Sequence, residues 1–266
     1  MQQLQAAGQK VGFVPTMGAL HQGHLSLIAQ ARQQTDVVVC SIFVNPTQFT
    51  DPKDLEKYPR PIEADIAKLE QAGCDVLFNP PVNEMYAGHE NWHLNIGEIE
   101  HLLEGEFRPG HYQGVMQVVS KLFSIINPNL AFFGQIDYQQ VMVIEQMIKR
   151  LSLPVKLVMC PIEREPDGLA MSSRNIHLTA DDRRHALVLS RALNKAKAEW
   201  QAGVPLLSIE QNAAELINLE SGTRLEYFVL ANGQTLHAAT PDSQSIVALV
   251  AARVGNTRLI DNVIIQ

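Results

Sequence analysis

The chain has 266 residues, of which 46% are hydrophobic, and its formal net charge is −7. This length allows a sizeable core and two domains, and the acidic balance argues against non-specific nucleic-acid binding. The longest apolar runs are shorter than a membrane span, and the first residues lack an export signal, so we expect a cytoplasmic protein with no membrane partner. Three widely spaced cysteines, Cys40, Cys74 and Cys160, are expected to be buried, reduced thiols.

An apolar run near the start of the chain stops at a loop of small residues and resumes with helical spacing. Val11–Val14 is typical of a buried strand, and Leu25 and Ile28 begin an amphipathic helix. Between them lies an HxGH sequence, with His21 and His24 on one side of the first helical turn. Because a helix N-terminus after a parallel strand attracts anions, this junction predicts a phosphate site where both imidazoles donate to one polyphosphate. An ordinary polar helix start and a zinc site are the alternatives, but no further His or Cys cluster supports zinc.

Strands and helices alternate up to residue 160. The pattern predicts strands at 36–43, 76–78, 130–133 and 155–160, helices at 61–73, 113–126 and 137–151, and an irregular segment at 79–111. This alternation is typical of a doubly wound α/β domain with a mostly parallel, Rossmann-like sheet. Asn45 and Gln48 follow the second strand at the same sheet edge as the histidine loop, where capping of the loop by their amides is the other interpretation. Asp137 has a similar alternative role as a helix cap.

The pattern changes after Pro161. Capping-box sequences at Thr179–Asp182 and Ser208–Gln211 predict two helices, and strands are expected at 225–230, 246–254 and 259–265. We therefore predict a Rossmann-like domain at 1–162 and a smaller C-terminal α+β domain at 163–266. The loop Met171–Asn175 offers two serine hydroxyls for phosphate oxygens and Arg174 for the charge on a leaving pyrophosphate. Together with HxGH, this loop indicates attack on the α-phosphorus of ATP, giving an acyl adenylate or a transferred nucleotide.

The sequence resembles the pantothenate synthetase family, the pantoate–β-alanine ligases of the HIGH-type nucleotidyltransferase superfamily. The resemblance covers nearly the whole chain, through PTMGALHQGH, SIFVNPTQF, DLEKYPR, RPGHYQGV, FGQIDYQQ, DGLAMSSRN and LIDN. It implies that pantoate attacks ATP to give pantoyl adenylate and pyrophosphate, and that β-alanine then displaces AMP to give pantothenate. It also implies Mg²⁺ and a homodimer.

The resemblance assigns roles residue by residue. His24 is the implied general acid and His21 its partner on the phosphates; a helix N-terminus disfavours a charged imidazole and a polyphosphate favours it, so His24 is expected to be poised to give up a proton. Gln48 and Gln140, with Asn45 beside them, resemble pantoate-binding amides, and Asp65 is similar to an acidic residue assigned to Mg²⁺. The implied ATP contacts are Met17, Gly18, Ala19, Leu20, His21, Gln22, Gly23, His24, Gly134, Gln135, Ile136, Asp137, Glu163, Met171, Ser172, Ser173 and Arg174, the last also catalytic.

Two departures from the family pattern affect these expectations. Ile136 stands where the family's FGxKD motif has a lysine, so slow adenylation is expected. The chain also begins close to its first strand, where family members usually carry a further strand and part of a helix, so the N-terminal edge of the sheet is expected to be incomplete. Two other functions stay open: an ATP- and pantoate-binding homologue with little turnover, which Ile136 suggests, and another adenylyltransferase, whose acceptor pocket should be basic instead of carrying Gln48 and Gln140.

Overall fold

The computed structural model describes residues 7–88 and 91–266, which divide into two compact units. Unit 1 comprises the chain up to Gln135 together with Gln139–Pro161, and unit 2 comprises Ile136–Tyr138 together with Ile162–Gln266. The sequence places a domain border close to this division. It does not anticipate that the short segment 136–138 associates with unit 2.

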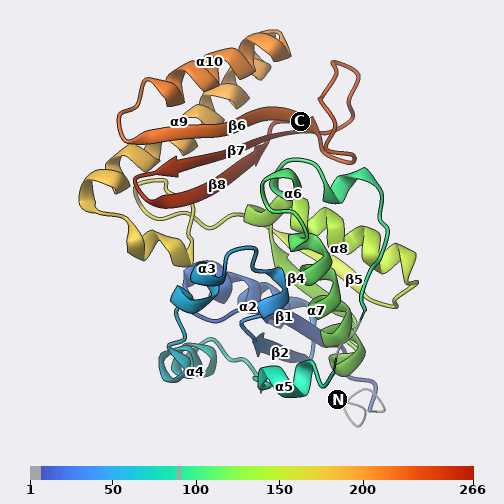
Figure 1. Ribbon diagram of the computed structural model, residues 1–266. Coiled ribbons are helices and arrows are strands. Elements are labelled where there is room, and N and C mark those ends of the chain that lie inside the picture. The colour runs from blue at the N-terminus through green and yellow to red at the C-terminus, as the bar shows by residue number, and fades with distance from the viewer. Residues whose placement is uncertain (1–6, 89–90) are drawn as a thin grey trace. The chain divides into compact units, whose positions relative to one another are not determined.

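Five parallel strands of the described chain form the sheet of unit 1, in the order β3-β2-β1-β4-β5 (Figure 1). β2 is buried along its whole length, as expected for a β-branched strand that is covered on both faces. The order reverses at β1, which pairs with β2 on one side and β4 on the other. In such a sheet, ligands bind beyond the carboxyl ends of the strands at this reversal. The predicted doubly wound α/β fold is confirmed. The strands are β1 (Val11–Thr16), β2 (Val37–Ile42), β3 (Val76–Phe78), β4 (Leu130–Gly134) and β5 (Lys156–Cys160).

Helices cover both faces of this sheet, because successive side chains of a strand point to opposite faces. Val14 of β1 belongs to the cluster that contains Ile28 of α2, whereas Phe13 makes an edge contact with Phe123 of α7, with ring centroids 6.3 Å apart. In the segment 79–111, expected to be irregular, the described residues before His111 form short helices and no strand. The helices are α2 (Gln22–Gln34), α3 (Pro52–Lys57), α4 (Ile62–Gln71), α5 (Val82–Met85), α6 (Glu104–Phe107), α7 (His111–Ile126) and α8 (Tyr138–Arg150), with 3-10 turns η1 (Pro46–Gln48), η2 (Glu98–Glu100) and η3 (Gln135–Asp137).

Residues 162–266, all of them described, form an antiparallel sheet in the order β6-β7-β8 with two helices packed against it (Figure 1). The strands are β6 (Thr223–Asn232), β7 (Ile246–Val254) and β8 (Thr257–Ile264), and the helices are α9 (Ala180–Gln201) and α10 (Leu206–Asn218). Leu189, Ile209 and Ile246 are core residues shared by the helices and the sheet. β6 is longer than predicted because its pairing with β7 continues to Asn232.

The two predicted capping boxes of unit 2 have different outcomes. Thr179 and Asp182 form the expected reciprocal box at the start of α9. The box predicted at Ser208 and Gln211 is wrong, because α10 begins earlier, with Pro205 as its N-cap and Leu206 as its first residue. Proline suits a helix start, since its missing N–H is one that the first turn leaves unbonded in any case.

The cysteines agree with the sequence expectation apart from one exposure. All three are free, and Cys40 and Cys160 are buried. Burial raises the pKa of the Cys160 thiol to about 11. Cys74 is only half-buried, because it lies in the turn before edge strand β3. Among the described helices, none has the length and apolar character needed to cross a membrane.

Candidate nucleotide and substrate site

The two histidines of the HxGH sequence form a reciprocal cap on α2. His21 is the N-cap residue, and its Nδ1 accepts the N–H of Gly23 at 3.2 Å. Nδ1 of His24 in turn accepts the N–H of His21 at 3.3 Å. The two ring centroids lie 4.1 Å apart. The structure thus brings His21 and His24 together at the helix N-terminus that follows β1.

This arrangement sets the protonation of His24. Because its Nδ1 accepts a backbone N–H, the neutral ring carries its proton on Nε2. Burial, followed by the neighbouring His21 and Lys68 groups, lowers the pKa of His24 to about 3. At neutral pH the imidazole therefore offers an Nε2–H donor, and a general-acid role requires a bound anion that raises its pKa.

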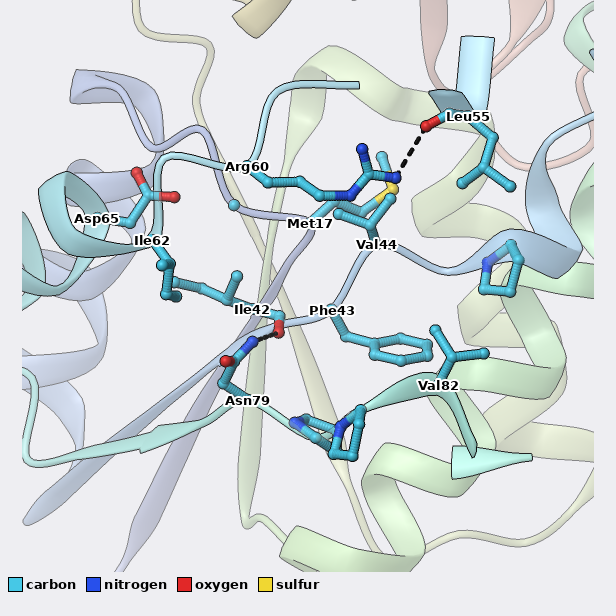
Figure 2. A pocket seen from close by; sticks show the side chains of 14 residues that line it. Met17, Ile42, Phe43, Val44, Leu55, Arg60, Ile62, Asp65, Asn79 and Val82 are labelled. Atoms are coloured by element: carbon cyan, nitrogen blue, oxygen red, sulfur yellow. Dashed lines mark hydrogen bonds between the residues drawn. The ribbon is translucent and has the colours of Figure 1, made fainter. Parts of the chain in front are cut away.

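Helix α4 holds the loop that leads into His21. The Asp65 carboxylate, in a residue that is 1% exposed, accepts the N–H groups of Ala19 at 2.7 Å and Leu20 at 2.8 Å. Nζ of Lys68 donates to the carbonyl of Leu20 at 2.6 Å. Asp65 and Met17 line a cavity of about 430 Å³ whose wall is mostly apolar side chains from the ends of β1, β2 and β3 (Figure 2). Within the described residues, no group of three His, Cys, Asp or Glu side chains is suited to a metal ion.

Asn45 fills the loop-capping role that the sequence left open. It is 1% exposed, and its Nδ2 donates to Oε1 of Gln48 and to the carbonyl of Gly114, each at 3.1 Å. Its Oδ1 accepts the hydroxyl of Tyr86 at 2.7 Å and the N–H of Thr47 at 3.4 Å. These bonds occupy both ends of the Asn45 amide, so the side chain acts on Gln48 and on η1.

Gln48 keeps more freedom than Asn45. Its Nε2 donates to the thioether of Met17 at 3.2 Å, and sulfur is a weak acceptor that a carboxylate or hydroxyl oxygen outcompetes. The backbone carbonyl of Gln48 lies 2.7 Å from Nδ1 of His111, at the start of α7. Met17, Asn45 and Gln48 therefore form one hydrogen-bonded set in unit 1, and His111 fixes its backbone.

Adjacent glutamines at the start of α8 have different surroundings. Gln139 is buried, donates to the carbonyls of Ile99 and Leu102 at 2.8 and 2.7 Å, and accepts the N–H of Glu104. Gln140 is half-buried, and its side-chain amide forms no hydrogen bond within the described parts of the chain. Gln139 thus holds the irregular segment in place, whereas the amide of Gln140 is left for other contacts.

In unit 2, the loop Met171–Asn175, called the serine and arginine loop below, is fixed at its backbone. Met171 N–H donates to the carbonyl of Glu163 at 2.9 Å, and Oγ of Ser172 caps η4 (Ser173–His177) by accepting the N–H of Arg174. Asn175 donates to the carboxylate of Glu165 at 2.8 Å.

Arg183 of α9 reinforces this hold. It pairs with Glu165 at 2.5 Å and with Asp167 at 2.8 Å, and its hydrogen bond lowers the pKa of Glu165. The side chain of Arg174 is half-buried and forms no ion pair with any residue of the described chain.

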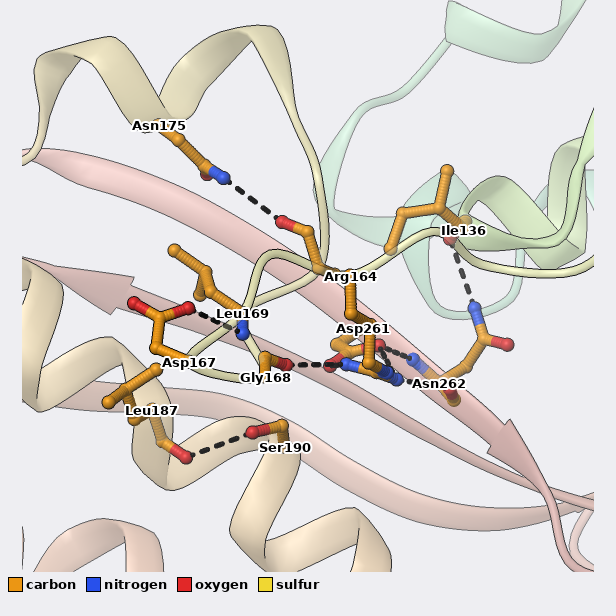
Figure 3. A network of polar contacts seen from close by, with 11 residues as sticks. Ile136, Arg164, Asp167, Gly168, Leu169, Asn175, Leu187, Ser190, Asp261 and Asn262 are labelled. Carbon is orange, nitrogen blue, oxygen red and sulfur yellow. Dashed lines mark hydrogen bonds and ion pairs between the residues drawn. The ribbon is translucent and has the colours of Figure 1, made fainter. Parts of the chain in front are cut away.

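The LIDN sequence on β8 links two predicted nucleotide-contacting segments of unit 2 (Figure 3). Asp261 receives two hydrogen bonds from Arg164, at 2.7 and 2.9 Å, beside the start of the serine and arginine loop. Asn262 donates to the backbone carbonyl of Ile136 at 3.0 Å. Sequence reasoning matched LIDN to the family without giving it a role, because no local pattern shows which distant backbone it binds.

The chain matches one protein family over nearly its whole length. A family model described as Pantoate-beta-alanine ligase matches residues 1–264. The chain is 46% identical to the pantothenate synthetase of Desulfitobacterium hafniense over 260 residues, covering 97% of this chain and 92% of that protein. It is 48% identical to that of Pseudomonas fluorescens over 260 residues, with coverage of 97% and 92%.

Solved structures give the same result. The pantothenate synthetase from Thermus thermophilus is 41% identical with a TM-score of 0.94, covering 99% of this chain and 97% of that one. The pantoate-beta-alanine ligase from Francisella tularensis, complexed with beta-gamma ATP and beta-alanine, is 38% identical with a TM-score of 0.80, covering 97% and 90%.

Proposed function

The chain belongs to the pantoate–beta-alanine ligase family, and we infer from this membership that it joins pantoate to β-alanine at the expense of ATP. In the first step a pantoate carboxylate oxygen attacks the α-phosphorus of ATP, and the bond to the bridging oxygen of pyrophosphate breaks. In the second step the amine of β-alanine attacks the carbonyl of pantoyl adenylate, loses a proton and releases AMP. The product is pantothenate, and the bond formed is an amide.

The observation that carries this proposal is the reciprocal His21–His24 cap, in a chain that matches the family over residues 1–264. Both imidazoles accept a backbone N–H at Nδ1, so each neutral ring carries its proton on Nε2, and His24 can donate that N–H to a phosphate oxygen. We assign His24 to the charge that develops on the phosphates during adenylation, as a hydrogen-bond donor and, once the bound polyphosphate raises its pKa, as the general acid. His21 shares this contact.

The other phosphate and nucleotide roles fall to unit 2 and to the end of β4. Arg174, which forms no ion pair within the described chain, is assigned to the charge of leaving pyrophosphate, with Ser172 and Ser173 as further donors. The backbone between Gly134 and Asp137 and the backbone at Glu163 are assigned to the nucleotide. Ile136 supplies no cation there, so the first step is expected to be slow.

Pantoate is assigned to the amides of Gln48 and Gln140. Gln48 is oriented by Asn45 and donates to the weak thioether acceptor of Met17, which the oxygen of a substrate can replace. The side-chain amide of Gln140 has no hydrogen-bond partner among the described residues. Neutral amides suit an uncharged hydroxyl and a single carboxylate, which favours pantoate over the phosphorylated acceptors of other adenylyltransferases.

The residue assigned to Mg²⁺ does not fit a protein-held cation. Asp65 is 1% exposed and uses both oxygens on the backbone N–H groups of Ala19 and Leu20. No cluster of three candidate ligands stands among the described side chains. We therefore derive no step through a metal held by this chain. The homodimer and the cytoplasmic location remain parts of the proposal that rest on the family resemblance and the sequence.

The test is release of AMP from ATP that depends on both pantoate and β-alanine, with pyrophosphate release followed separately. His24→Ala should slow pyrophosphate release by about 10²–10⁴-fold, and His93→Ala, at an exposed histidine, should not change it. ATP and pantoate binding without AMP release would replace the proposal with the non-catalytic homologue. AMP transfer to an acceptor other than pantoate would indicate a different adenylyltransferase.

A further inference from the structure

The loop between β1 and α2 has an unusual backbone. Gly18 and Ala19 both have positive φ, 80° and 51°. Glycine adopts this conformation readily, but in Ala19 the Cβ crowds the following carbonyl oxygen. A strained residue of this kind persists where the surrounding structure fixes it. A neighbouring group of unit 1 is therefore expected to hold Ala19 in this conformation.

Every backbone N–H from Gly18 to His21 is bonded inside unit 1. Gly18 donates to Oγ1 of Thr16 at 3.1 Å, and His21 donates to Nδ1 of His24 at 3.3 Å. The two N–H groups between them, of Ala19 and Leu20, both donate to the carboxylate of Asp65. The main chain of this loop therefore does not cradle phosphate as a glycine-rich loop does, and recognition of the anion is left to the imidazoles.

Asp65 and Lys68 act from the same face of α4, since they are three residues apart. Asp65 accepts two charge-assisted bonds, and Lys68 donates to the carbonyl of Leu20 at 2.6 Å, so both polar groups of the Leu20 backbone are held. A Cβ placed on Gly18 would lie 3.1 Å from Oδ2 of Asp65, which shows how closely the loop packs against that carboxylate. His21 directly follows Leu20, so the position of its backbone depends on this loop.

We propose that Asp65, together with Lys68, is a positioning residue that holds the Gly18–Leu20 backbone and thereby aims His21 and His24, and that it is not a metal ligand. The direction of the two Nε2–H groups depends on the backbone at His21, which follows directly from the loop that Asp65 holds. The proposal rests on the proposed function only in so far as adenylation is one of its readouts.

The first experiment compares Asp65→Asn with Glu63→Gln, which removes an exposed carboxylate from the first turn of the same helix. An amide at position 65 sets an NH₂ group against backbone N–H donors, so one of the two bonds is lost. Single-turnover pyrophosphate release should slow by about tenfold in Asp65→Asn, from the loss of a hydrogen bond to a charged group, and should be unchanged in Glu63→Gln. The Mg²⁺ concentration that gives half-maximal rate should stay as in the wild type.

The second experiment is a rescue. Ala19→Gly removes the crowding at positive φ, so adding it to Asp65→Asn should restore part of the rate. A metal ligand gives the opposite pattern: a raised Mg²⁺ requirement, recovery at high Mg²⁺ and no effect of Ala19→Gly. That pattern would overturn the proposal.

A readout that does not use activity separates this proposal from the proposed function. Hydrogen exchange of the Ala19 and Leu20 amides should be slow in the wild type and in Glu63→Gln, and faster in Asp65→Asn. If Asp65→Asn does not fold, Lys68→Met removes the bond to the Leu20 carbonyl instead, and exchange of the His21 amide, which shares that peptide group, should become faster. A wild-type protein that protects these amides but releases no pyrophosphate would refute the proposed function and leave the positioning role of Asp65 intact. Unchanged exchange in the folded variants would refute that positioning role.

Discussion

Lowering the pH from 7 to 5 should destabilise the folded protein through His24. The pKa of this imidazole is about 3 in the folded state, because of burial first and then of the neighbouring His21 and Lys68. In the unfolded chain a histidine has a pKa of about 6.5. Between these two values the unfolded state binds a proton that the folded state does not, so stability falls as the pH falls below about 6.5.

The magnitude follows from the two pKa values. Between pH 7 and pH 5 the unfolded chain goes from about one quarter to nearly full protonation at this position, while the folded protein stays neutral there. One such group lowers the free energy of unfolding by about 2 kcal/mol over this range. The hydrogen bond from the N–H of His21 to Nδ1 of His24 also favours the neutral ring in the folded state, since protonation of Nδ1 would remove the acceptor. Its loss would therefore destabilise the folded protein in the same direction.

Urea unfolding at the two pH values measures this loss. His24→Gln removes the titrating group, so its stability should change by about 2 kcal/mol less than that of the wild type between pH 7 and pH 5. His93→Gln, at an exposed histidine, should keep the full wild-type change. If the free energy of unfolding of the wild type and of His24→Gln depended equally on pH, His24 would have an ordinary pKa in the folded state. The argument that burial lowers this pKa would then be wrong.

The same titration decides how His24 takes part in adenylation. If bound ATP raises the pKa of His24 above the ambient pH, binding takes up a proton and the affinity for ATP increases as the pH falls. Calorimetry in two buffers of different ionisation enthalpy measures that proton directly. Proton uptake that His24→Gln abolishes would support the general-acid role. Binding without proton uptake would leave His24 as a neutral Nε2–H donor.

Three further predictions concern the pantoate pocket, the nucleotide segment and the support of η1. Gln48→Ala and Gln140→Ala should each raise the KM for pantoate, by the equivalent of about 1–3 kcal/mol, more than they weaken ATP binding; an unchanged pantoate KM would contradict the assignment. Ile136→Lys should speed single-turnover pyrophosphate release, since a single donor to a developing charge contributes about 2.7–4 kcal/mol in a transition state, and should leave the β-alanine step from preformed pantoyl adenylate unchanged; equal rates in both proteins would refute the deficiency. Gly114→Ala would place a Cβ 2.3 Å from the carbonyl oxygen of Thr47, so it should lower the free energy of unfolding by about 1–3 kcal/mol and raise the pantoate KM, whereas Gly88→Ala, whose Cβ meets nothing within 4 Å, should do neither.

The parts of the fold that the sequence predicts well are those that neighbouring residues determine. The buried strand Val37–Ile42 follows from a continuous β-branched run, and the cap of α9 follows from Thr179 and Asp182, which are three residues apart. The HxGH junction is local in the same sense, because His21 and His24 complete each other's bonds within one helical turn. In the box predicted at Ser208, the residue types are right but the chain has already entered the helix at Pro205.

The parts that the sequence does not predict depend on contacts between distant segments. Asp65 is an acidic residue near a phosphate loop, and its sequence neighbours cannot show that both oxygens bind the backbone 45 and 46 residues earlier. Asn262 lies 126 residues from the carbonyl of Ile136 that it binds. In each case the residue type is compatible with a ligand contact or with a backbone contact, and only the three-dimensional partner decides which.

The amides of the site show how this distinction shapes the response to substitution. Gln139 and Asn45 bind backbone groups of other segments, whereas Gln140, one residue along the chain from Gln139, binds none among the described residues. Removing an amide that holds a backbone leaves buried N–H and C=O groups without partners, so stability and catalysis fall together. Removing an amide that faces substrate leaves the fold as it was and changes only the kinetics. Chemically identical neighbours in one YQQ sequence therefore have opposite mutational signatures, and the ratio of stability loss to rate loss identifies which of them touches pantoate.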